Sequence, residues 1–433
     1  MRQRVLIIST APPVPVDNGK RMVLSGLLDY FVDRLGADNV HYTLLGARGV
    51  ARPEFAGVAH RLDPPSTVGQ LGTLVGRLAR DRSYTAQEAM LGSPALREQI
   101  QALIAWLRPT IEVYDTLRMG QHAPTTRGTD DEPARRFLYL DDLFSLRYER
   151  MLAFDRDNEV HIDPLGEFAT NVPGPLRALV RRPAVYRRVL KMERDRIRRR
   201  EIEMARRFDT SLLVNPNEVR VLRERAGTQA VRGISGLLPE VTPVHRDPVN
   251  PPELLFLGRL NIPHNEDAIT TFLTAVMPQL VERLPGVVLR VIGSGASPRL
   301  QELAARFGDQ VRLEGFVADL EPVFARVTAS VAPLRFGTGI KIKMLDTLAR
   351  GVPVLTTRLG VDGIDIHTDG RDGCLVADDL DQWPELLAEM SVRSENDLLS
   401  KAAAAYFDRT FSRRVVMARY DEVFGLAPVP THQ

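Results

Sequence analysis

The chain has 433 residues, of which 44% are hydrophobic and 26% are charged, and its formal net charge is +2. This composition is that of a globular protein, so it excludes a disordered, collagen-like or coiled-coil chain and suggests two domains. The single cysteine, Cys374, excludes an internal disulfide and any zinc site with two or more thiolates, and it favours a reducing, cytoplasmic compartment. The first apolar run has only four residues, too few for a signal peptide, and no stretch approaches the length of a membrane span.

The small net charge hides an asymmetry between the two halves of the chain. Residues 1–245 carry 37 basic and 30 acidic side chains, a balance of +7, whereas the remainder has a balance of −5. The basic excess is concentrated in a predicted helix at 177–207, which holds 13 basic and 4 acidic residues and a single aromatic, Tyr186. So little aromatic interleaving argues against nucleic acid and favours an anionic membrane surface. A solvated helix face is the simpler alternative, and it stays open.

The first half alternates short apolar strands with longer helical stretches. Its opening strand is continuously apolar, as expected for a strand that is covered on both faces in a parallel sheet. A stretch at 151–175 has no clear period and is expected to be irregular. The predicted strands are 4–10, 39–45, 109–114, 135–143 and 210–214, and the predicted helices are 20–35, 66–80, 93–107 and 177–207.

The second half follows a linker at 239–252 that contains five prolines. Its strands and helices alternate regularly with short loops, which predicts a parallel, doubly wound α/β sheet. In such sheets a ligand lies beyond the carboxyl ends of the strands. The predicted strands are 254–257, 287–292, 311–313, 329–333 and 354–357, and the predicted helices are 265–283, 298–307, 320–327, 339–349, 397–407 and 412–424.

The segment 335–351 is the strongest candidate for a binding site. A strand ends, a glycine-rich turn follows, and a helix begins, so free backbone N–H groups face the turn. Lys341 and Lys343 add positive charge, which suits an extended diphosphate. Asp346, two turns into the helix, is expected to face a ribose or sugar hydroxyl. The simpler alternative is a well-capped helix with solvated lysines.

Three further loops of the second half follow predicted strands. Gly258 and Arg259 end the first strand, and arginine suits bidentate phosphate recognition, although a surface arginine is common there. Gly293 follows the next strand, where a tight turn and a phosphate or base contact are both reasonable. Phe316 and Val317 follow a third strand and could surround a nucleobase, or the phenylalanine could belong to the core.

In the first half, candidate residues again stand where strands end. Gly19 opens a helix after the first strand and is accompanied by two cations. Asp141 and Asp142 end a strand, where carboxylates could orient sugar hydroxyls, act as a base or bind a metal. The alternative is that one of them is the N-cap of the following helix. No histidine and glutamate cluster has metal-site spacing, and no P-loop or Gly-x-Ser-x-Gly motif occurs.

Taken in order, the motifs of residues 253–363 resemble the donor-binding domain of GT-B glycosyltransferases and are most similar to glycosyltransferase family 4. The first half matches more loosely. The motifs are Phe256-Leu-Gly-Arg-Leu260, Pro263-His-Asn265, Val291-Ile-Gly293, Glu314-Gly-Phe-Val317, Ala332-Pro-Leu-Arg335, Gly337-Thr-Gly-Ile-Lys-Ile-Lys-Met-Leu-Asp346 and Gly351-Val-Pro-Val354.

The resemblance implies a GT-B fold, in which two doubly wound, Rossmann-like domains face a cleft. Residues 1–245 would bind the acceptor, residues 246–410 would bind a nucleotide-diphosphate sugar, and residues 411–433 would form a C-terminal helix that returns to the first domain. It further implies transfer of a hexosyl group to a glycan, lipid-linked or other acceptor, in bacterial surface polysaccharide or glycoconjugate synthesis. The reaction would retain configuration and need neither metal nor cofactor, and the protein would be cytoplasmic or peripheral on the cell membrane.

The resemblance also assigns residues to roles. Arg259 would contact the diphosphate, and Lys341 or Lys343 would compensate for a second basic contact. We further expect Gly258, Gly293 and Ile340 to belong to the donor site, and Gly19 to let the backbone approach the transferred sugar. The chain departs from the family pattern at three positions. Asn265 stands where a second basic contact is usual, Thr338, beside Gly339, stands where the first of two acids is usual, and Asp346 replaces the usual glutamate at the second. The usual histidine of the first domain maps to Asp141 and Asp142, so we expect catalytic roles for these two and for Asp346.

Two rival functions stay open at this stage. A nucleotide-sugar epimerase uses the same two-domain architecture. A non-catalytic protein that binds sugar nucleotides or glycans would explain the threonine at the usual acidic position.

Overall fold

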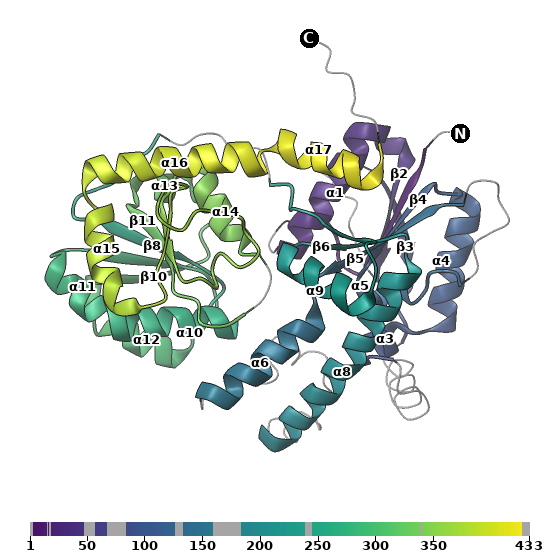
Figure 1. Ribbon diagram of the computed structural model, residues 1–433, viewed down its shortest axis with the longest axis horizontal. Coiled ribbons are helices and arrows are strands. Elements are labelled where there is room, and N and C mark those ends of the chain that lie inside the picture. Colours follow the sequence, from purple (N-terminus) through teal and green to yellow (C-terminus); the bar gives the residue numbers. More distant parts are fainter. Residues whose placement is uncertain are drawn as a thin grey trace, which may run out of the picture. The chain divides into compact units, whose positions relative to one another are not determined.

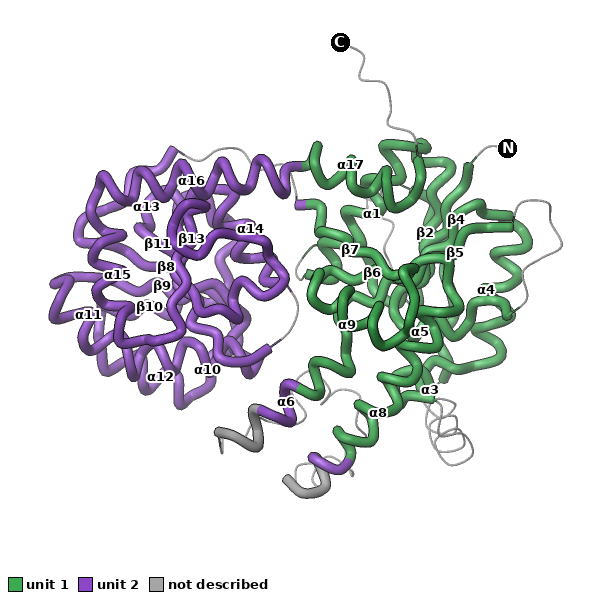
Figure 2. The backbone as a smooth tube through the Cα atoms, viewed as in Figure 1, with its two compact units in different colours: residues 1–149, 189–237, 413–433 green, residues 150–188, 238–412 purple. Residues whose placement is uncertain are grey.

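The computed structural model describes residues 3–14, 16, 19–46, 57–66, 84–125, 133–158, 183–238, 245–337 and 340–426. The chain divides into two compact units (Figure 2). Unit 1 comprises residues 1–149, 189–237 and 413–433, and unit 2 comprises residues 150–188 and 238–412. Each unit is built on its own parallel sheet.

The sheet of unit 1 has seven parallel strands in the order β3-β2-β1-β4-β5-β6-β7. From β1 the chain adds β2 and β3 on one side and then β4 to β7 on the other, so the strand order reverses between the neighbours β1 and β4. The strands are β1 Val5–Ile8, β2 Val40–Leu45, β3 Val58–Leu62, β4 Ile111–Asp115, β5 Arg135–Asp141, β6 Thr210–Leu213 and β7 Val231–Gly233.

The sheet of unit 2 repeats this plan with six parallel strands in the order β10-β9-β8-β11-β12-β13, and here the order reverses between β8 and β11. Such reversal points are where open parallel sheets bind ligands, beyond the carboxyl ends of the strands. The strands are β8 Glu253–Leu257, β9 Val288–Ile292, β10 Val311–Gly315, β11 Ala329–Ala332, β12 Val354–Thr356 and β13 Cys374–Val376.

Helices connect the strands in both units (Figure 1). Those that begin in the first half of the chain are α1 Gly19–Leu35, α3 Ala86–Leu91, α4 Pro94–Leu107, α5 Thr116–Gly120, α6 Phe144–Asn158, α8 Pro183–Arg207 and α9 Pro216–Ala226. Those of the second half are α10 Pro263–Thr271, α11 Met277–Arg283, α12 Pro298–Ala305, α13 Glu321–Arg326, α14 Ile342–Ala349, α15 Trp383–Met390, α16 Arg393–Phe411 and α17 Arg413–Phe424.

The central strand of unit 2 is buried on both faces, which explains its unbroken apolar sequence. Leu254 and Phe256 belong to one core cluster, with Phe272 and Leu280 from the helical stretch after β8. Leu255, which points to the opposite face, belongs to a second cluster that includes Phe324 of α13. The predicted doubly wound α/β architecture, with two Rossmann-like sheets, is therefore confirmed.

The last helix, α17, packs in unit 1 against α1 and β5. The ring of Phe424 lies 4.8 Å from that of Phe31 and 4.8 Å from that of Phe137. Asp421 accepts hydrogen bonds from the Tyr30 hydroxyl (2.9 Å) and from Nε of Arg34 (2.8 Å). An apolar cluster and a charged one thus join the end of the described chain to α1.

Some sequence expectations fail or lie outside the described residues. The expected irregular stretch 151–175 is wrong in its first part, because α6 continues to Asn158; its polar sequence lacks the apolar period that marks a helix. The predicted helix at 66–80 lies almost wholly outside the described residues. The short edge strands β3, β7 and β13 were not predicted, because only one residue of each is buried and the apolar signal is weak.

Candidate active site

In unit 2 the loops that follow β8, β9 and β10 are joined by backbone hydrogen bonds. The amide of Gly258 donates to the carbonyl oxygen of Ile292 (3.0 Å), and the amide of Gly293 donates to that of Gly315 (2.7 Å). The sheet pairing therefore continues past the strand ends into the loops. This fixes the position of each loop relative to the next.

Gly293 and Gly258 are glycines because the loops approach too closely for a side chain. A Cβ atom on Gly293 would lie 1.7 Å from the carbonyl oxygen of Gly258, and one on Gly258 would lie 2.9 Å from Cγ of Asn265. Asn265 donates a hydrogen bond from Nδ2 to the carbonyl oxygen of Arg259 (2.9 Å). The asparagine that replaces a basic residue of the family pattern thus braces the loop that carries Arg259.

Three of the predicted charged residues come together at the reversal point of this sheet. Arg259 follows β8 and is exposed, whereas Lys343 and Asp346 lie in α14, which follows β11. Lys343 keeps an exposed surface, yet its pKa is lowered, first by desolvation among its neighbours and then by the positive charge of Arg259, while Asp346 acts in the opposite direction. The positive charges of Arg259 and Lys343 thus disfavour each other, and an anion bound at this edge of the sheet would relieve that repulsion.

Two other charged groups of this segment already have partners. Asp346 forms an ion pair with Arg350, one turn further along α14, and the guanidinium of Arg350 lies 4.8 Å from the ring centre of Phe324. Arg335 donates from Nε to Asp267 of α10 (2.9 Å). Arg335 is thereby held toward α10, and a sugar hydroxyl would compete with Arg350 for Asp346.

The glycine-rich turn is only partly described. Thr338 and Gly339 lie outside the described residues, and Ile340 and Lys341 are half-buried. The N-cap position of α14 is Lys341, whose side chain makes no capping hydrogen bond. The first turn of α14 therefore begins without a carboxylate or hydroxyl at its N-cap, which leaves the positive end of the helix dipole to other anions.

Phe316 lies outside the core. Its side chain is 82% exposed in the loop after β10, so the alternative of a core phenylalanine is wrong. Gly315 just before it has a φ of 67°, and Val317 just after it packs against the cluster that contains Phe324. The turn at Gly315 and the anchor at Val317 present the phenylalanine ring to solvent.

In unit 1 the end of β4 is joined to the start of α1 by an ion pair with a buried carboxylate, which sequence analysis missed. The carboxylate of Asp115 is fully buried, accepts a hydrogen bond from the Ser9 hydroxyl (2.7 Å) and lies 2.8 Å from Nζ of Lys20. Lys20 is the second residue of α1, directly after Gly19. The signal was an acidic residue at the end of a buried strand, the same signal that singled out Asp141.

Asp141 ends β5 in a strained and electrostatically unusual position. Its φ is 68°, a left-handed conformation that is uncommon for a residue with a side chain, and its Oδ1 accepts a hydrogen bond from the Tyr139 hydroxyl (2.7 Å). Desolvation and then the charge of Asp142 raise its pKa to about 6, while Lys20 and Arg147 act in the opposite direction. This carboxyl can therefore exchange a proton near neutral pH.

Asp142 is buried and forms an ion pair with Arg147 in the second turn of α6. We expected one of the two aspartates to cap α6, but the backbone amides at the start of this helix donate to other carboxylates. The amide of Leu143 donates to Oε2 of Glu218 (2.7 Å), and the amide of Ser145 donates to Oε1 of Glu201 (3.2 Å). The start of α6 is thus capped by carboxylates of α9 and α8, two helices that are distant in sequence but packed next to it.

Within the described ranges, no three His, Cys, Asp or Glu side chains gather in a way that could hold a metal ion. None of the described helices is long and apolar enough to cross a lipid bilayer.

Comparison with known proteins supports the resemblance seen in the second half. Residues 251–391 match the family model "Glycosyl transferases group 1". A phosphatidyl-myo-inositol mannosyltransferase of Mycobacterium tuberculosis is 30% identical over 183 residues, which are 40% of this chain and 47% of that protein. The chain thus matches less than half the length of this curated relative.

Solved structures match over nearly the whole chain. Sucrose-phosphate synthase from Thermosynechococcus elongatus has a TM-score of 0.63 at 14% identity, with 98% of each chain covered. HepE of Anabaena, in complex with UDP and glucose, has a TM-score of 0.57 at 12% identity, with 98% of this chain and 99% of that chain covered. At these identities the likeness is one of fold. The resemblance to GT-B glycosyltransferases and the predicted GT-B fold are confirmed.

Proposed function

We propose that this protein is a glycosyltransferase that transfers a sugar from a nucleotide-diphosphate donor bound to unit 2. The observation that carries the proposal is the convergence of Arg259 and Lys343 at the reversal point of the second sheet, beside loops that are fixed by close glycine contacts. The pKa of Lys343 is lowered first by desolvation and then by the positive charge of Arg259, and a diphosphate bound at this edge would be attracted to both cations. Phe316, exposed at the same strand edge, would cover the nucleobase.

The chemical role of these groups is to stabilise the leaving nucleoside diphosphate. As the glycosidic bond to the donor breaks, negative charge grows on the departing phosphate oxygen, and preorganised cations and helix N–H groups lower the energy of that state. We expect Arg259, Lys341, Lys343 and the start of α14, with Thr338 and Gly339, to supply this stabilisation without a metal. Transfer would retain the sugar's configuration, as the likeness to family 4 implies.

Unit 1 would bind the acceptor near Gly19 and the aspartates that end β5. We expect Asp142 or Asp141 to contact the transferred sugar or the acceptor hydroxyl, and Asp346 to bind a donor hydroxyl once it exchanges its pairing with Arg350. Asp141 can accept a proton near neutral pH, because its pKa is raised to about 6.

The acceptor would be a glycan or a lipid-linked molecule of bacterial surface glycoconjugate synthesis, reached from the cytoplasmic face of the membrane. The mycobacterial relatives are named for transfer to phosphatidyl-myo-inositol, a lipid. The exposed face of α8 carries Arg188, Lys191 and Arg198 beside the exposed apolar side chains Val189 and Met192. That combination suits an anionic membrane surface. Equal pelleting with anionic and neutral liposomes would count against this part of the proposal.

A screen of nucleotide sugars, with and without a panel of acceptors, tests the proposed activity. We expect slow donor hydrolysis without an acceptor, faster transfer with one, and loss of both in Arg259→Gln. An epimerase would interconvert a nucleotide sugar without any acceptor. Stabilisation by nucleotide sugars without turnover over the whole panel would favour a non-catalytic binding protein.

A further inference from the structure

Arg196 is a buried cation of unit 1 that the proposed chemistry does not use. It lies in the middle of α8, its residue is only 6% exposed, and its Nη1 atom has no hydrogen-bond partner among the residues that the structure describes. Burying a guanidinium is costly unless its hydrogen-bond donors are satisfied. An unsatisfied donor in this position calls for an acceptor that the described residues do not supply.

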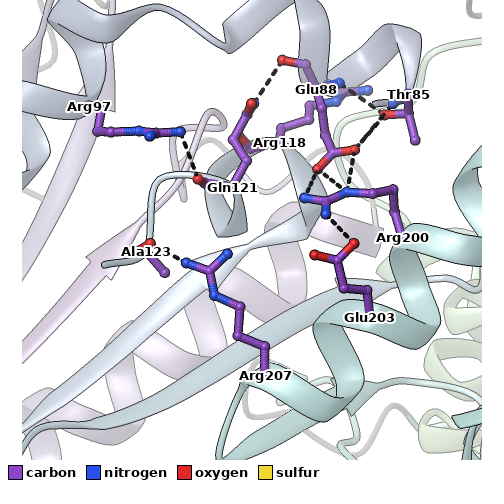
Figure 3. Close-up of polar contacts among 9 residues, drawn as sticks. All are labelled: Thr85, Glu88, Arg97, Arg118, Gln121, Ala123, Arg200, Glu203 and Arg207. Carbon is purple, nitrogen blue, oxygen red and sulfur yellow. Dashed lines mark hydrogen bonds and ion pairs between the residues drawn. The ribbon is translucent and has the colours of Figure 1, made fainter. Parts of the chain in front are cut away.

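The neighbouring arginine of the same helix shows how such a group is ordinarily satisfied. Arg200, one turn later, donates from Nε and Nη2 to Oε1 of Glu88 (2.9 and 2.7 Å), and Glu88 in turn belongs to the capping box of α3 with Thr85 (Figure 3). The Arg200 guanidinium also lies 5.3 Å from the ring centre of Tyr84. Arg200 is therefore a structural cation, and Arg196 differs from it in lacking such a partner for Nη1.

The contacts around Arg196 connect it to the carboxyl edge of the first sheet. Glu193, one turn earlier in α8, accepts a hydrogen bond from the amide of Ala86 (2.7 Å) and interacts electrostatically with Arg196. The next residue of α3, Gln87, accepts a hydrogen bond from Nε of Arg118 (3.2 Å). Arg118 lies in α5, which directly follows β4.

Glu193 is a weak counter-charge for Arg196. Burial raises its pKa to about 7, so near neutral pH a large share of the molecules carry it uncharged. Arg118 itself lies three residues after Asp115, which ends β4. The surroundings of Arg196 thus become more positive when Glu193 holds its proton.

We propose that Arg196 and Arg118 form an anion subsite in unit 1 that binds a phosphate group of the acceptor. Guanidinium groups bind phosphate oxygens in pairs of parallel hydrogen bonds, which would satisfy Nη1 of Arg196. The proposal names the acceptor class, a phosphate ester, and in this respect it rests on the proposed glycosyltransferase function. The anion subsite itself does not depend on that function.

The test measures binding of inorganic pyrophosphate by calorimetry to full-length protein that carries Arg259→Gln, so that the donor site contributes little. In this background we compare Arg196→Met with Arg188→Met, a change of an exposed arginine on the same helix. We expect Arg196→Met to weaken binding roughly tenfold or more and Arg188→Met to leave it unchanged. Glu193→Gln, which removes the counter-charge, should tighten binding. Unchanged affinity in Arg196→Met, or no binding to the Arg259→Gln protein, would overturn the subsite.

The melting temperature of the ligand-free variants separates a binding role from a structural one. If Arg196 binds an anion and is otherwise uncompensated, Arg196→Met should raise the melting temperature of the ligand-free protein. If Arg196 instead has a structural role, the same substitution should lower the melting temperature. Competition with farnesyl phosphate, with farnesol as the uncharged control, then identifies the source of the phosphate. Displacement of pyrophosphate by farnesyl phosphate but not by farnesol would support a phosphate-ester acceptor. If neither compound displaces pyrophosphate, that acceptor class is contradicted. Pyrophosphate binding that depends on Arg196 in a protein without any transferase activity would keep the subsite and refute only the proposed function.

Discussion

Replacing Gly293 by alanine should disable donor binding without unfolding unit 2. The added Cβ would lie 1.7 Å from the carbonyl oxygen of Gly258, which is roughly half of an ordinary contact distance. Because the clashing atom belongs to the backbone, the loop that carries Arg259 must move by about 1–2 Å. Overpacking of this kind costs about 1–3 kcal/mol of stability, and a displacement of about 1 Å at a reacting centre costs about 100-fold in rate.

The assay is calorimetric titration with the nucleoside diphosphate that stabilises the wild type, together with kcat/KM for donor turnover. Gly308→Ala is the matched control, because Gly308 also has a positive φ (56°) but a Cβ there would meet nothing within 4 Å. We expect Gly308→Ala to lose a little stability and no donor affinity. Wild-type affinity and turnover in Gly293→Ala would refute the reasoning that these loops position the donor.

Three further predictions concern stability and pH. The folded protein holds the proton of Asp141 up to a pKa of about 6, above its ordinary value of 3.8, so wild-type stability should fall as pH rises from about 4 to 6. Asp141→Asn should make that fall in melting temperature smaller, leaving the part that comes from Glu193 and Glu201, whose pKa values are also raised, and it should abolish any limb of kcat/KM near pH 6. Phe424→Ala should lower the free energy of unfolding, measured by chemical denaturation, by about 3–5 kcal/mol, because this fully buried ring joins α17 to α1 and β5. The control variant Val392→Ala, at an exposed position, should change it little. Arg200→Met should lower the free energy of unfolding by about 3–5 kcal/mol, because it leaves the carboxylate of Glu88 buried without its partner. The double variant, with Arg200→Met and Glu88→Met, should recover most of that loss, which would not happen if Arg200 only filled space.

Local sequence was sufficient to predict the inner strands of both sheets and the loops at their carboxyl ends. A continuous apolar run such as that of β8 indicates a strand covered on both faces, and the glycines at 258 and 293 indicate close approach of the backbone just beyond it. The apolar run and the glycines are both features of neighbouring residues in the sequence, so they can be recognised before the fold is known. Arg259 and Lys343 were candidates for the same reason, because each follows the end of a parallel strand.

What the sequence did not reveal depends on contacts between distant segments. The helix start after Asp142 is capped by Glu218 and Glu201, which lie more than fifty residues further along the chain. The basic stretch at 177–207 suggested a helix face toward an anionic membrane or toward solvent, yet Arg196 and Arg200 are buried. A count of charges cannot tell an exposed arginine from one that pairs with a buried carboxylate, since the partner comes from another element.

A crystal structure with an intact nucleotide sugar bound would test the central claim most directly. We predict that the diphosphate oxygens lie within hydrogen-bond distance of the guanidinium of Arg259 and the ammonium of Lys343, with the nucleobase against Phe316. A nucleotide bound elsewhere on unit 2, or one that leaves both cations in water, would contradict the account.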